Sequence, residues 1–241
     1  MRNFTIVAAG LGAMLIAAPA FAQDAPGQNP EQEKRVYVGG FVGDRFGSGQ
    51  TFRGANLAGQ PRVIETPTKD NVTGGIVVGM VAARGDWGRV RVEGELSASQ
   101  NSVKRLVLND VRRELLEGRK SLTTEMVNLV YDTPKVANLV RFSLGGGIGN
   151  GSIDYDIRYN VSAAGPAINI PTSVSGHIAY QAIGGAAISV GRRVELTTDV
   201  RYLGVTGHQV ERFNATAGTL DSVLRTRYHS VSATVGFRFF L

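Results

Sequence analysis

The sequence predicts an all-β protein, a closed antiparallel eight-stranded up-and-down transmembrane β-barrel. Three observations lead to this fold class: strict alternation of side-chain character near the C-terminus, alternation of long and short connections along the chain, and an export signal at the N-terminus. Alternation with a period of two indicates a strand, because successive side chains point to opposite faces.

The alternation is clearest in residues 228–241. From His229 onward one set of alternate residues is almost wholly apolar and ends in Phe237, Phe239 and Leu241. The other set is small, polar or charged until Phe240. We expect this strand to close the barrel by pairing with residues 36–41. Arg238 should then face inward toward a carboxylate, and Phe237 and Phe239 should lie near Trp87 in an aromatic girdle.

The N-terminus has the pattern of a secretory signal peptide over residues 1–22. Arg2 precedes an apolar run, which Pro19 interrupts just before the small-residue cleavage site Ala20-Phe21-Ala22. Residues 23–34 are polar and predict a flexible segment, and residues 35–241 are predicted to form the barrel. We therefore expect a cleaved, exported protein in the outer membrane of a Gram-negative cell.

The composition excludes several classes of protein. The chain has no cysteine, so it has neither a disulfide framework nor thiol chemistry. With 31 glycines but only 8 prolines, it is neither collagen-like nor a proline-rich linker. The net charge of +6 is modest, and for an exported protein it favours contact with lipopolysaccharide phosphates over nucleic acid.

Strand-like segments and their connections alternate in a regular way. The predicted strands are approximately 35–44, 72–84, 88–99, 122–131, 139–149, 174–189, 194–205 and 226–241. The second and third, fourth and fifth, and sixth and seventh of these are joined by short turns, whereas the other four connections are long. Short periplasmic turns and long external loops are typical of outer-membrane barrels.

Charged and apolar residues occupy opposite faces of several predicted strands. If the apolar face meets lipid, the charged face fills an interior just wide enough for side chains. Buried charges must pair, so we expect an internal ion-pair network of Arg91, Glu93, Glu95, Arg141, Glu195, Asp199, Arg201 and Arg238.

Several short motifs resemble a known family. They are Val36-Tyr37-Val38-Gly39-Gly40-Phe41, residues 127–132, 144–149, 179–184 and 200–203, and the strand 229–240. Their order and spacing are similar to those of the OmpA-like eight-stranded outer-membrane β-barrels of the opacity-protein or 25-kDa outer-membrane antigen type, in the porin family. The resemblance implies a surface protein, which the barrel-insertion machinery would assemble.

No catalytic, cofactor-binding or metal site is predicted, and we expect no enzymatic activity. A lipid A deacylase needs a histidine and a serine on one face, but His229 differs in parity from both Ser230 and Ser232. His177 and His208 are predicted to be isolated loop or rim residues. Two further motifs have ordinary explanations: Asp154 and Asp156 fit a solvated loop, and residues 145–151 place glycines inside a narrow barrel.

The connection 101–121 is the one with helical potential. Val103, Val107, Val111 and Leu115 recur every four residues. One hypothesis is a basic helix that docks on lipopolysaccharide phosphates through Arg112, Arg113, Arg119 and Lys120. The alternative is a solvated helix that covers the barrel mouth.

These observations favour an integral outer-membrane barrel, which we expect to be a monomer, with a structural or surface role in envelope integrity or adhesion. A narrow pore for ions or small solutes is the alternative, and a lipid A-modifying enzyme is a third hypothesis. The expected partners are outer-membrane lipid and lipopolysaccharide.

Overall fold

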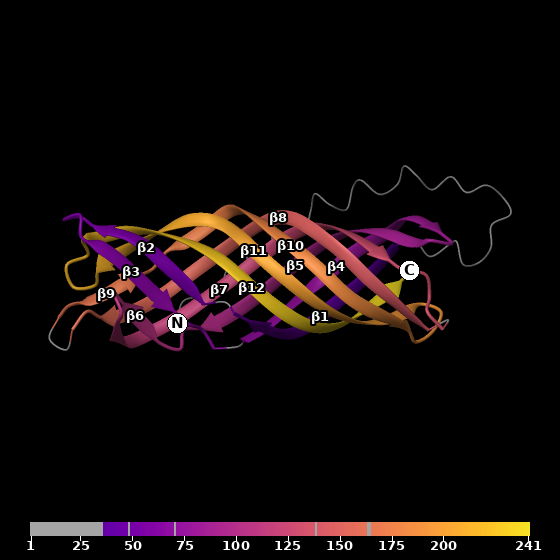
Figure 1. Ribbon diagram of the computed structural model, residues 1–241, viewed down its shortest axis with the longest axis horizontal. Helices are drawn as coiled ribbons and strands as arrows, with labels where there is room; N and C mark the ends of the chain where they lie inside the picture. Colours follow the sequence, from indigo (N-terminus) through magenta and orange to yellow (C-terminus); the bar gives the residue numbers. More distant parts are fainter. Residues whose placement is uncertain (1–35, 48, 70, 138, 163–164) are drawn as a thin grey trace. The chain divides into compact units, whose positions relative to one another are not determined.

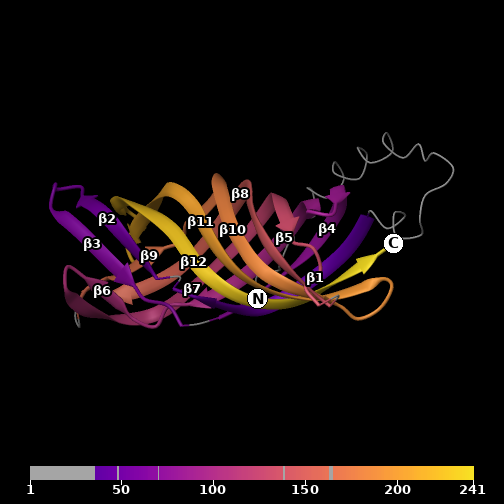
Figure 2. The same cartoon turned by 45° about the vertical axis from the view of Figure 1, so that its right-hand side comes forward.

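The computed structural model describes residues 36–241 except 48, 70, 138 and 163–164. The predicted signal peptide and flexible segment therefore lie outside the described residues. The described chain is all-β, with its elements wound around a common axis (Figures 1 and 2). The strands are β1 (Val36–Phe46), β2 (Gln50–Asn56), β3 (Pro61–Thr66), β4 (Asn71–Gly85), β5 (Gly88–Ser102), β6 (Leu106–Leu108), β7 (Val111–Asp132), β8 (Val140–Asn160), β9 (Ala167–Ile170), β10 (Ser173–Ser189), β11 (Val194–Asn214) and β12 (Leu220–Phe240).

Eight of these strands form the predicted closed ring. Its order is β1, β4, β5, β7, β8, β10, β11 and β12, and every neighbouring pair is antiparallel. The ring closes where β1 pairs with β12, from Tyr37 opposite Phe240 to Phe46 opposite Val231. Closure leaves no edge strand, so the backbone amides are satisfied even in a layer without water.

The four remaining strands form a second ring, which sequence reasoning missed. Beyond the ends of β1, β4, β5 and β10, the long strands β7, β8, β11 and β12 continue and pair with β2, β6 and β9, while β3 lies between β2 and β6. The cycle runs β12, β2, β3, β6, β7, β8, β9, β11 and back to β12. We call the first ring the lower ring and the second the upper ring; the short strands of the upper ring gather at one end in Figure 1.

The helix predicted for residues 101–121 is wrong. That segment contains β6 and the first part of β7, joined by a tight turn at Asn109 and Asp110 with φ of 48° and 65°. Within the described residues, no helix is long and apolar enough to cross a bilayer. Of the residues whose spacing suggested a helix, Val107 lies in β6, and Val111 and Leu115 lie in β7.

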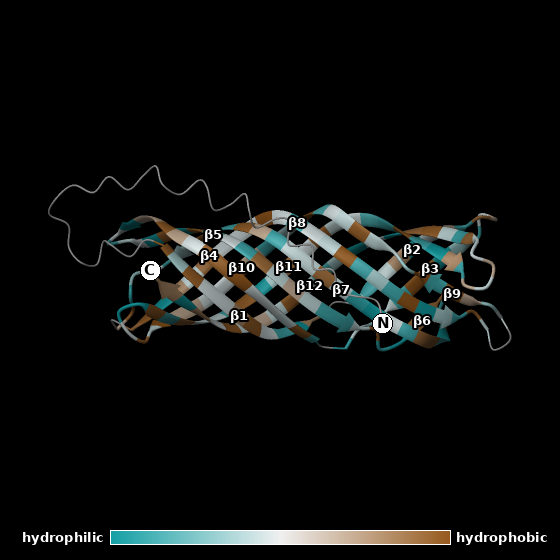
Figure 3. Cartoon of the chain, turned by 180° about the vertical axis from the view of Figure 1, so that it is seen from behind, coloured by the Kyte–Doolittle hydropathy of each residue, from teal (hydrophilic) through white to brown (hydrophobic). Residues whose placement is uncertain are grey.

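The outer surface changes character between the two rings. Hydrophobic and hydrophilic residues alternate along the strands (Figure 3). On the lower ring the exposed set is apolar, as β8 shows with Phe142, Leu144 and Ile148. We call this surface the apolar belt; its large exposed residues include Val38, Val42, Ile76, Val78, Val127, Leu129, Phe142, Leu144, Ile148, Val200, Val231, Val235 and Phe237.

On the upper ring the pattern is reversed. Further along β8 the exposed residues are Asp154, Asp156 and Arg158, while Ile153 and Ile157 are buried inside. The interior of the upper ring is an apolar core, built from Phe52, Ile64, Leu106, Ile153, Tyr155, Ile157, Tyr159, Ile170, Val210, Leu224 and Tyr228 among others. The same core extends into the lower ring through Leu122 and Met126, which lie opposite residues of β5. This is the pattern of a water-soluble barrel, in which apolar burial stabilises the fold.

Exposed aromatic side chains occur near the short-turn end, and the predicted girdle that brings Phe237 and Phe239 beside Trp87 stays a prediction. The Trp87 ring stacks on Tyr131 with 6.2 Å between centroids, and the Tyr131 hydroxyl donates to the Trp87 carbonyl oxygen at 2.6 Å. Phe237 and Phe239 are exposed on the outer face of β12. Aromatic side chains at such positions are typical of membrane interfaces.

Candidate functional site

The lumen of the lower ring is the most chemically distinctive region, and Asp132, at its short-turn end, binds two arginines. Arg91 donates two parallel hydrogen bonds to Asp132, from Nε to Oδ2 and from Nη2 to Oδ1, each 2.9 Å long. Arg89 Nε donates to the same Oδ2 at 2.6 Å, and Ser143 donates to Oδ1 at 2.8 Å. Asp132 is 0% exposed. A buried carboxylate with four donors is fully compensated for the water it has lost.

Glu195 on β11 links β5 to β12 through two arginines. It accepts from Arg89 Nη2 at 2.7 Å and from Arg238 Nη1 at 3.3 Å. Glu93 accepts from Arg91 and from the Tyr37 hydroxyl. The ion pairs therefore join β5, β7, β11 and β12 across the lumen, and the hydrogen bond of the Tyr37 hydroxyl adds β1.

A second cluster lies around Glu95. Its Oε2 accepts from Arg201 Nη1 at 2.8 Å and from Asn128 Nδ2 at 2.9 Å. Gln181 Nε2 donates to Asn128 Oδ1 at 2.7 Å, which connects β10 to the same cluster. Arg201 also contacts Asp199 at 3.3 Å.

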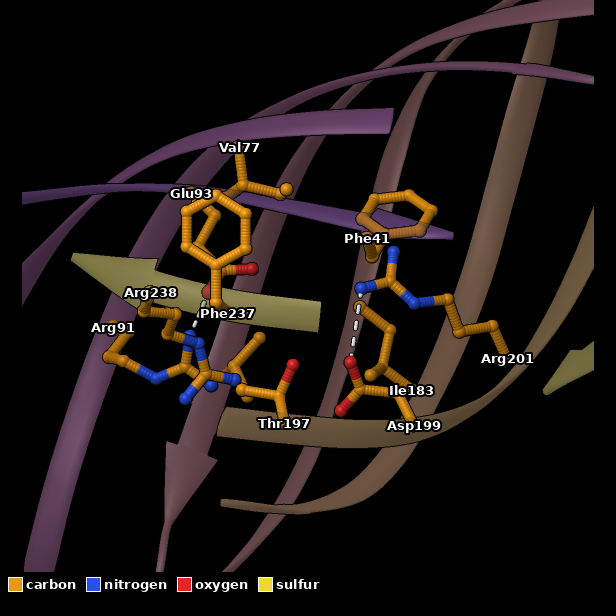
Figure 4. A pocket seen from close by; sticks show the side chains of 13 residues that line it. Phe41, Val77, Arg91, Glu93, Ile183, Thr197, Asp199, Arg201, Phe237 and Arg238 are labelled. Carbon is orange, nitrogen blue, oxygen red and sulfur yellow. Dashed lines mark hydrogen bonds and ion pairs between the residues drawn. The ribbon is translucent and has the colours of Figure 1, made fainter. Parts of the chain in front are cut away.

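Small and aromatic side chains fill the space left between the charges. Figure 4 shows the Arg201 guanidinium lying over the Phe41 ring, with its Cζ 4.0 Å from the ring centroid. A Cβ on Gly147 would overlap Asn128 Oδ1, so this glycine is what allows the Asn128 carboxamide into the lumen. The cavity that remains is about 20 Å³, room for roughly one water molecule.

The structure places most of the predicted network residues together. Arg91, Glu93, Glu95, Glu195, Asp199, Arg201 and Arg238 are all buried and ion-paired. Arg141 differs: it is half-buried at the short-turn end, and its Nη1 donates to the Thr133 carbonyl oxygen at 3.2 Å, with no ion pair found within the described residues.

Sequence reasoning missed Arg89, Asp132 and Tyr37. Arg89 and Asp132 are directly opposite each other at the ends of β5 and β7. The sequence placed Arg89 on the charged face of the strand 88–99 but not in the ion-pair network, and it assigned Asp132 to a short connection. The sequence could have identified Arg89, because it is two residues from Arg91 and therefore lies on the same, inward face of the strand. Tyr37 was read as part of an apolar strand, although its hydroxyl reaches Glu93 and Arg91.

The apolar core of the upper ring contains one fully buried lysine. Lys120 is 1% exposed, its Nζ donates to Thr66 Oγ1 at 2.7 Å, and it lies 5.6 Å from the centroid of the Phe52 ring. No carboxylate forms an ion pair with it among the residues that the structure describes. Burial therefore lowers the pKa of Lys120 to about 7.

The four predicted lipopolysaccharide contacts are divided between two faces. Arg112 and Arg119 are exposed, whereas Lys120 is buried in the core and Arg113 is half-buried. A register shift between Leu115 and Glu117 separates Arg112 and Arg113 from the lower part of β7. The four residues consequently do not form one surface, and Lys120 cannot contact a lipid head group.

The histidines are not all isolated, contrary to the sequence-based expectation. The rings of His177 and His208 lie 5.4 Å apart, and His208 Nε2 is 2.7 Å from the Tyr155 hydroxyl. Burial lowers the pKa of His208, while a contact with the Thr206 carbonyl oxygen opposes this shift. No group of three or more potential metal ligands occurs in the described part of the chain.

The other residues considered for chemistry lie on separate faces. His229 is exposed on the outer surface, while Ser230 and Ser232 are buried on the lumen side. Asp154 and Asp156 lie on the outer face of β8 rather than in a loop. The glycines 145–149 lie within β8, consistent with the expectation of a narrow interior.

Comparison with known proteins gives structural matches only, since no family model and no curated protein sequence matches this chain. The outer membrane protease OmpT from Escherichia coli superposes with a TM-score of 0.54 at 8% sequence identity, covering 86% of this chain and 97% of that one. The outer membrane protein OprG from Pseudomonas aeruginosa gives a TM-score of 0.55 at 12% identity, covering 86% and 96%. This protein therefore has the fold of the small bacterial outer-membrane β-barrels.

Proposed function

We propose that this chain is an integral outer-membrane protein with a sealed lumen, which supports the envelope and presents a rigid surface outside the cell. The lower ring spans the membrane, and the upper ring stands above it in water. This role requires no catalysis and no cofactor. The finer assignment to the opacity-protein or 25-kDa antigen type belongs to the same proposal and rests on the sequence motifs alone.

The observation that carries the proposal is the reversal of faces along single strands. On β12 the outer residues are Val235 and Val231 in the lower ring, and Arg227 and Arg225 in the upper ring. The strands β7, β8, β11 and β12 each contain 21 or 22 residues, roughly twice the 9–11 that a tilted strand needs to cross a bilayer. One half of each strand is thus suited to lipid and the other half to water.

The filled lumen favours a scaffold over the alternative of a narrow pore. Its guanidinium and carboxylate groups are paired across the ring, and the cavity that lies among Arg91, Asp199 and Arg201 is about 20 Å³, far too small for a continuous water column. Above it, the apolar core of the upper ring presents a second barrier to ions, because charges are costly to place among apolar side chains.

The upper ring also supports a role in surface contact. Its hairpins are paired into a closed sheet, so their tips are held in fixed positions, which lowers the entropic cost of binding another surface. Adhesion to an external partner is therefore the surface role we propose. Assembly by the barrel-insertion machinery and a monomeric state are part of the same proposal.

Two measurements test this function. The folded barrel should migrate differently on a gel with and without boiling, and it should be recovered with outer membranes. In planar bilayers the purified protein should give no steady single-channel current. Recovery as a soluble protein with unchanged mobility would contradict the membrane assignment, whereas regular channel openings would favour the pore.

A further inference from the structure

A basic hollow lies on the outer surface where the two rings meet. Its volume is about 890 Å³, and residues of β2, β11 and β12 line it. The charged residues of the lining are Arg53, Arg225 and Arg227, all exposed, with the exposed His229 beside them, and no aspartate or glutamate belongs to the lining.

The arginines are close together without acidic partners. Arg53 and Arg225 are directly opposite each other in the antiparallel pairing of β2 with β12, and Arg227 follows Arg225 on the same face. No ion pair within the described residues involves any of the three. Like charges at directly opposite positions destabilise a sheet, so this arrangement is one that an anionic ligand would relieve.

The wall of the barrel is interrupted at this point. On one side of β12, β1 ends at Phe46 and β2 begins at Gln50; on the other side, the pairing with β11 shifts register between Val205 and His208. Side-chain hydrogen bonds replace the regular ladder there, including Gln50 Nε2 to the Arg227 carbonyl oxygen at 3.2 Å. The break creates the recess that the arginines surround.

The height of the hollow relative to the apolar belt identifies the source of its ligand. Directly below His229 on the outer face of β12 are Val231, Ala233 and Val235. At the same level, β11 carries the exposed ring of Tyr202 opposite Val231, and β10 carries the exposed ring of Tyr180 6.4 Å away. Tyrosines above an apolar surface mark the level of lipid head groups.

We propose that the hollow binds a phosphate group carried by a glycolipid of the outer leaflet. Guanidinium groups bind phosphate through paired hydrogen bonds, and three of them around one recess suit a group with several anionic oxygens. The acyl chains of such a lipid would lie against the belt below the hollow. This inference rests on the proposed membrane location and names a site distinct from Arg112 and Arg119.

The test compares two triple variants of equal charge. The first is Arg53→Gln, Arg225→Gln and Arg227→Gln; the control is Lys104→Gln, Arg105→Gln and Arg158→Gln, which removes exposed cations of the upper ring outside the hollow. Each protein is placed in phosphatidylcholine nanodiscs, and its binding of fluorescent diphosphoryl lipid A is measured. We expect the first variant to bind about tenfold more weakly or worse, and the control to stay within about twofold of the parent.

Two further arms identify the ligand. Lipid A that lacks its phosphates should bind equally to the parent and to the first triple variant, because the arginines have no phosphate to contact. Inorganic phosphate should compete only weakly, because it lacks the acyl chains that lie against the belt; competition at equal concentration would show a site for free phosphate and overturn the lipid assignment. Equal binding by both triple variants would overturn the site itself. If both variants still show heat-modifiable migration, that failure leaves the proposed function intact.

Discussion

Arg91 and Asp132 form a two-hydrogen-bond ion pair, each bond 2.9 Å long, that joins neighbouring strands inside the lower ring. Arg89 binds the same carboxylate, so Asp132 compensates two buried guanidinium groups at once. A single carboxylate side chain therefore holds two arginines of the neighbouring strand in the lumen.

Replacing Asp132 with alanine should therefore destabilise the barrel strongly. The change leaves three buried arginines, Arg89, Arg91 and Arg238, with only Glu93 and Glu195 as partners, so that one buried positive charge is uncompensated. Such a loss is on the order of 3–5 kcal/mol. The loss of stability is measured by unfolding in urea, with the disappearance of the fast-migrating band on a gel as the readout. The matched control is Ser143→Ala, which removes one neutral donor to the same carboxylate and should cost about 1 kcal/mol. Equal losses for the two variants would contradict the central role of Asp132.

Gly147 should not accept a side chain. A Cβ at this position would overlap Asn128 Oδ1, which is held by its bond to Gln181, so Gly147→Ala should lower stability or prevent folding. The control is Gly184→Ala on β10, where no atom lies within 4 Å of the added carbon. Refolding yield into detergent measures both, and a normal yield for Gly147→Ala would show that the lumen can rearrange.

Lys120 should make the stability of the barrel depend on pH. Its folded pKa is about 7 against an ordinary 10.5, so between these values the unfolded chain binds more protons than the folded one. Stability should thus rise as pH increases from about 7 to 10.5, and the full penalty, on the order of 4–5 kcal/mol, should apply below about 7.

The variant Lys120→Met should remove this dependence. It keeps the length of the side chain without its amine, and Thr66 retains its hydrogen bond to the Gln50 carbonyl oxygen. Its free energy of unfolding should exceed that of the parent below about pH 7 and match it near pH 10.5. The exposed Lys104→Met serves as control. Parallel pH profiles for the parent and Lys120→Met would contradict the depressed pKa.

Removing the pair Glu95 and Arg201 together should loosen the lumen. The double variant Glu95→Ser and Arg201→Ser deletes the two largest side chains of the second cluster and admits water around Asp199. We expect the double variant to give no single-channel current in planar bilayers, because the apolar core of the upper ring still blocks the passage of ions. Exposed Thr198→Ser is the control. Channel openings in the double variant alone would show that the ion pairs are the only seal.

Much of the lower ring is predictable from sequence. Its strands face two different solvents, lipid outside and a polar lumen inside, so residues such as Arg238 and Phe237 alternate without interruption. The structure places Arg238 inside against Glu195 and exposes Phe237.

The upper ring is less predictable for two physical reasons. There the apolar residues face the interior. A segment such as 153–159 therefore alternates in the same way as a strand of the lower ring, but its apolar side chains point inward instead of outward. Register shifts, as between Leu115 and Glu117, also break the period of two. The hydrogen bonds of the short strands β3 and β6 join residues far apart in the chain, and local patterns contain no information about such partners.

The continuity of β7, β8, β11 and β12 through both rings has a consequence for how the surface can be altered. Any residue added in the middle of these strands would shift every later side chain to the opposite face, in lipid and in water alike. The hairpin tips, such as Asn109-Asp110 and residues 215–219, are free of this constraint. Foreign epitopes should therefore be inserted successfully at the tips, because an insertion there shifts no side chain of either ring.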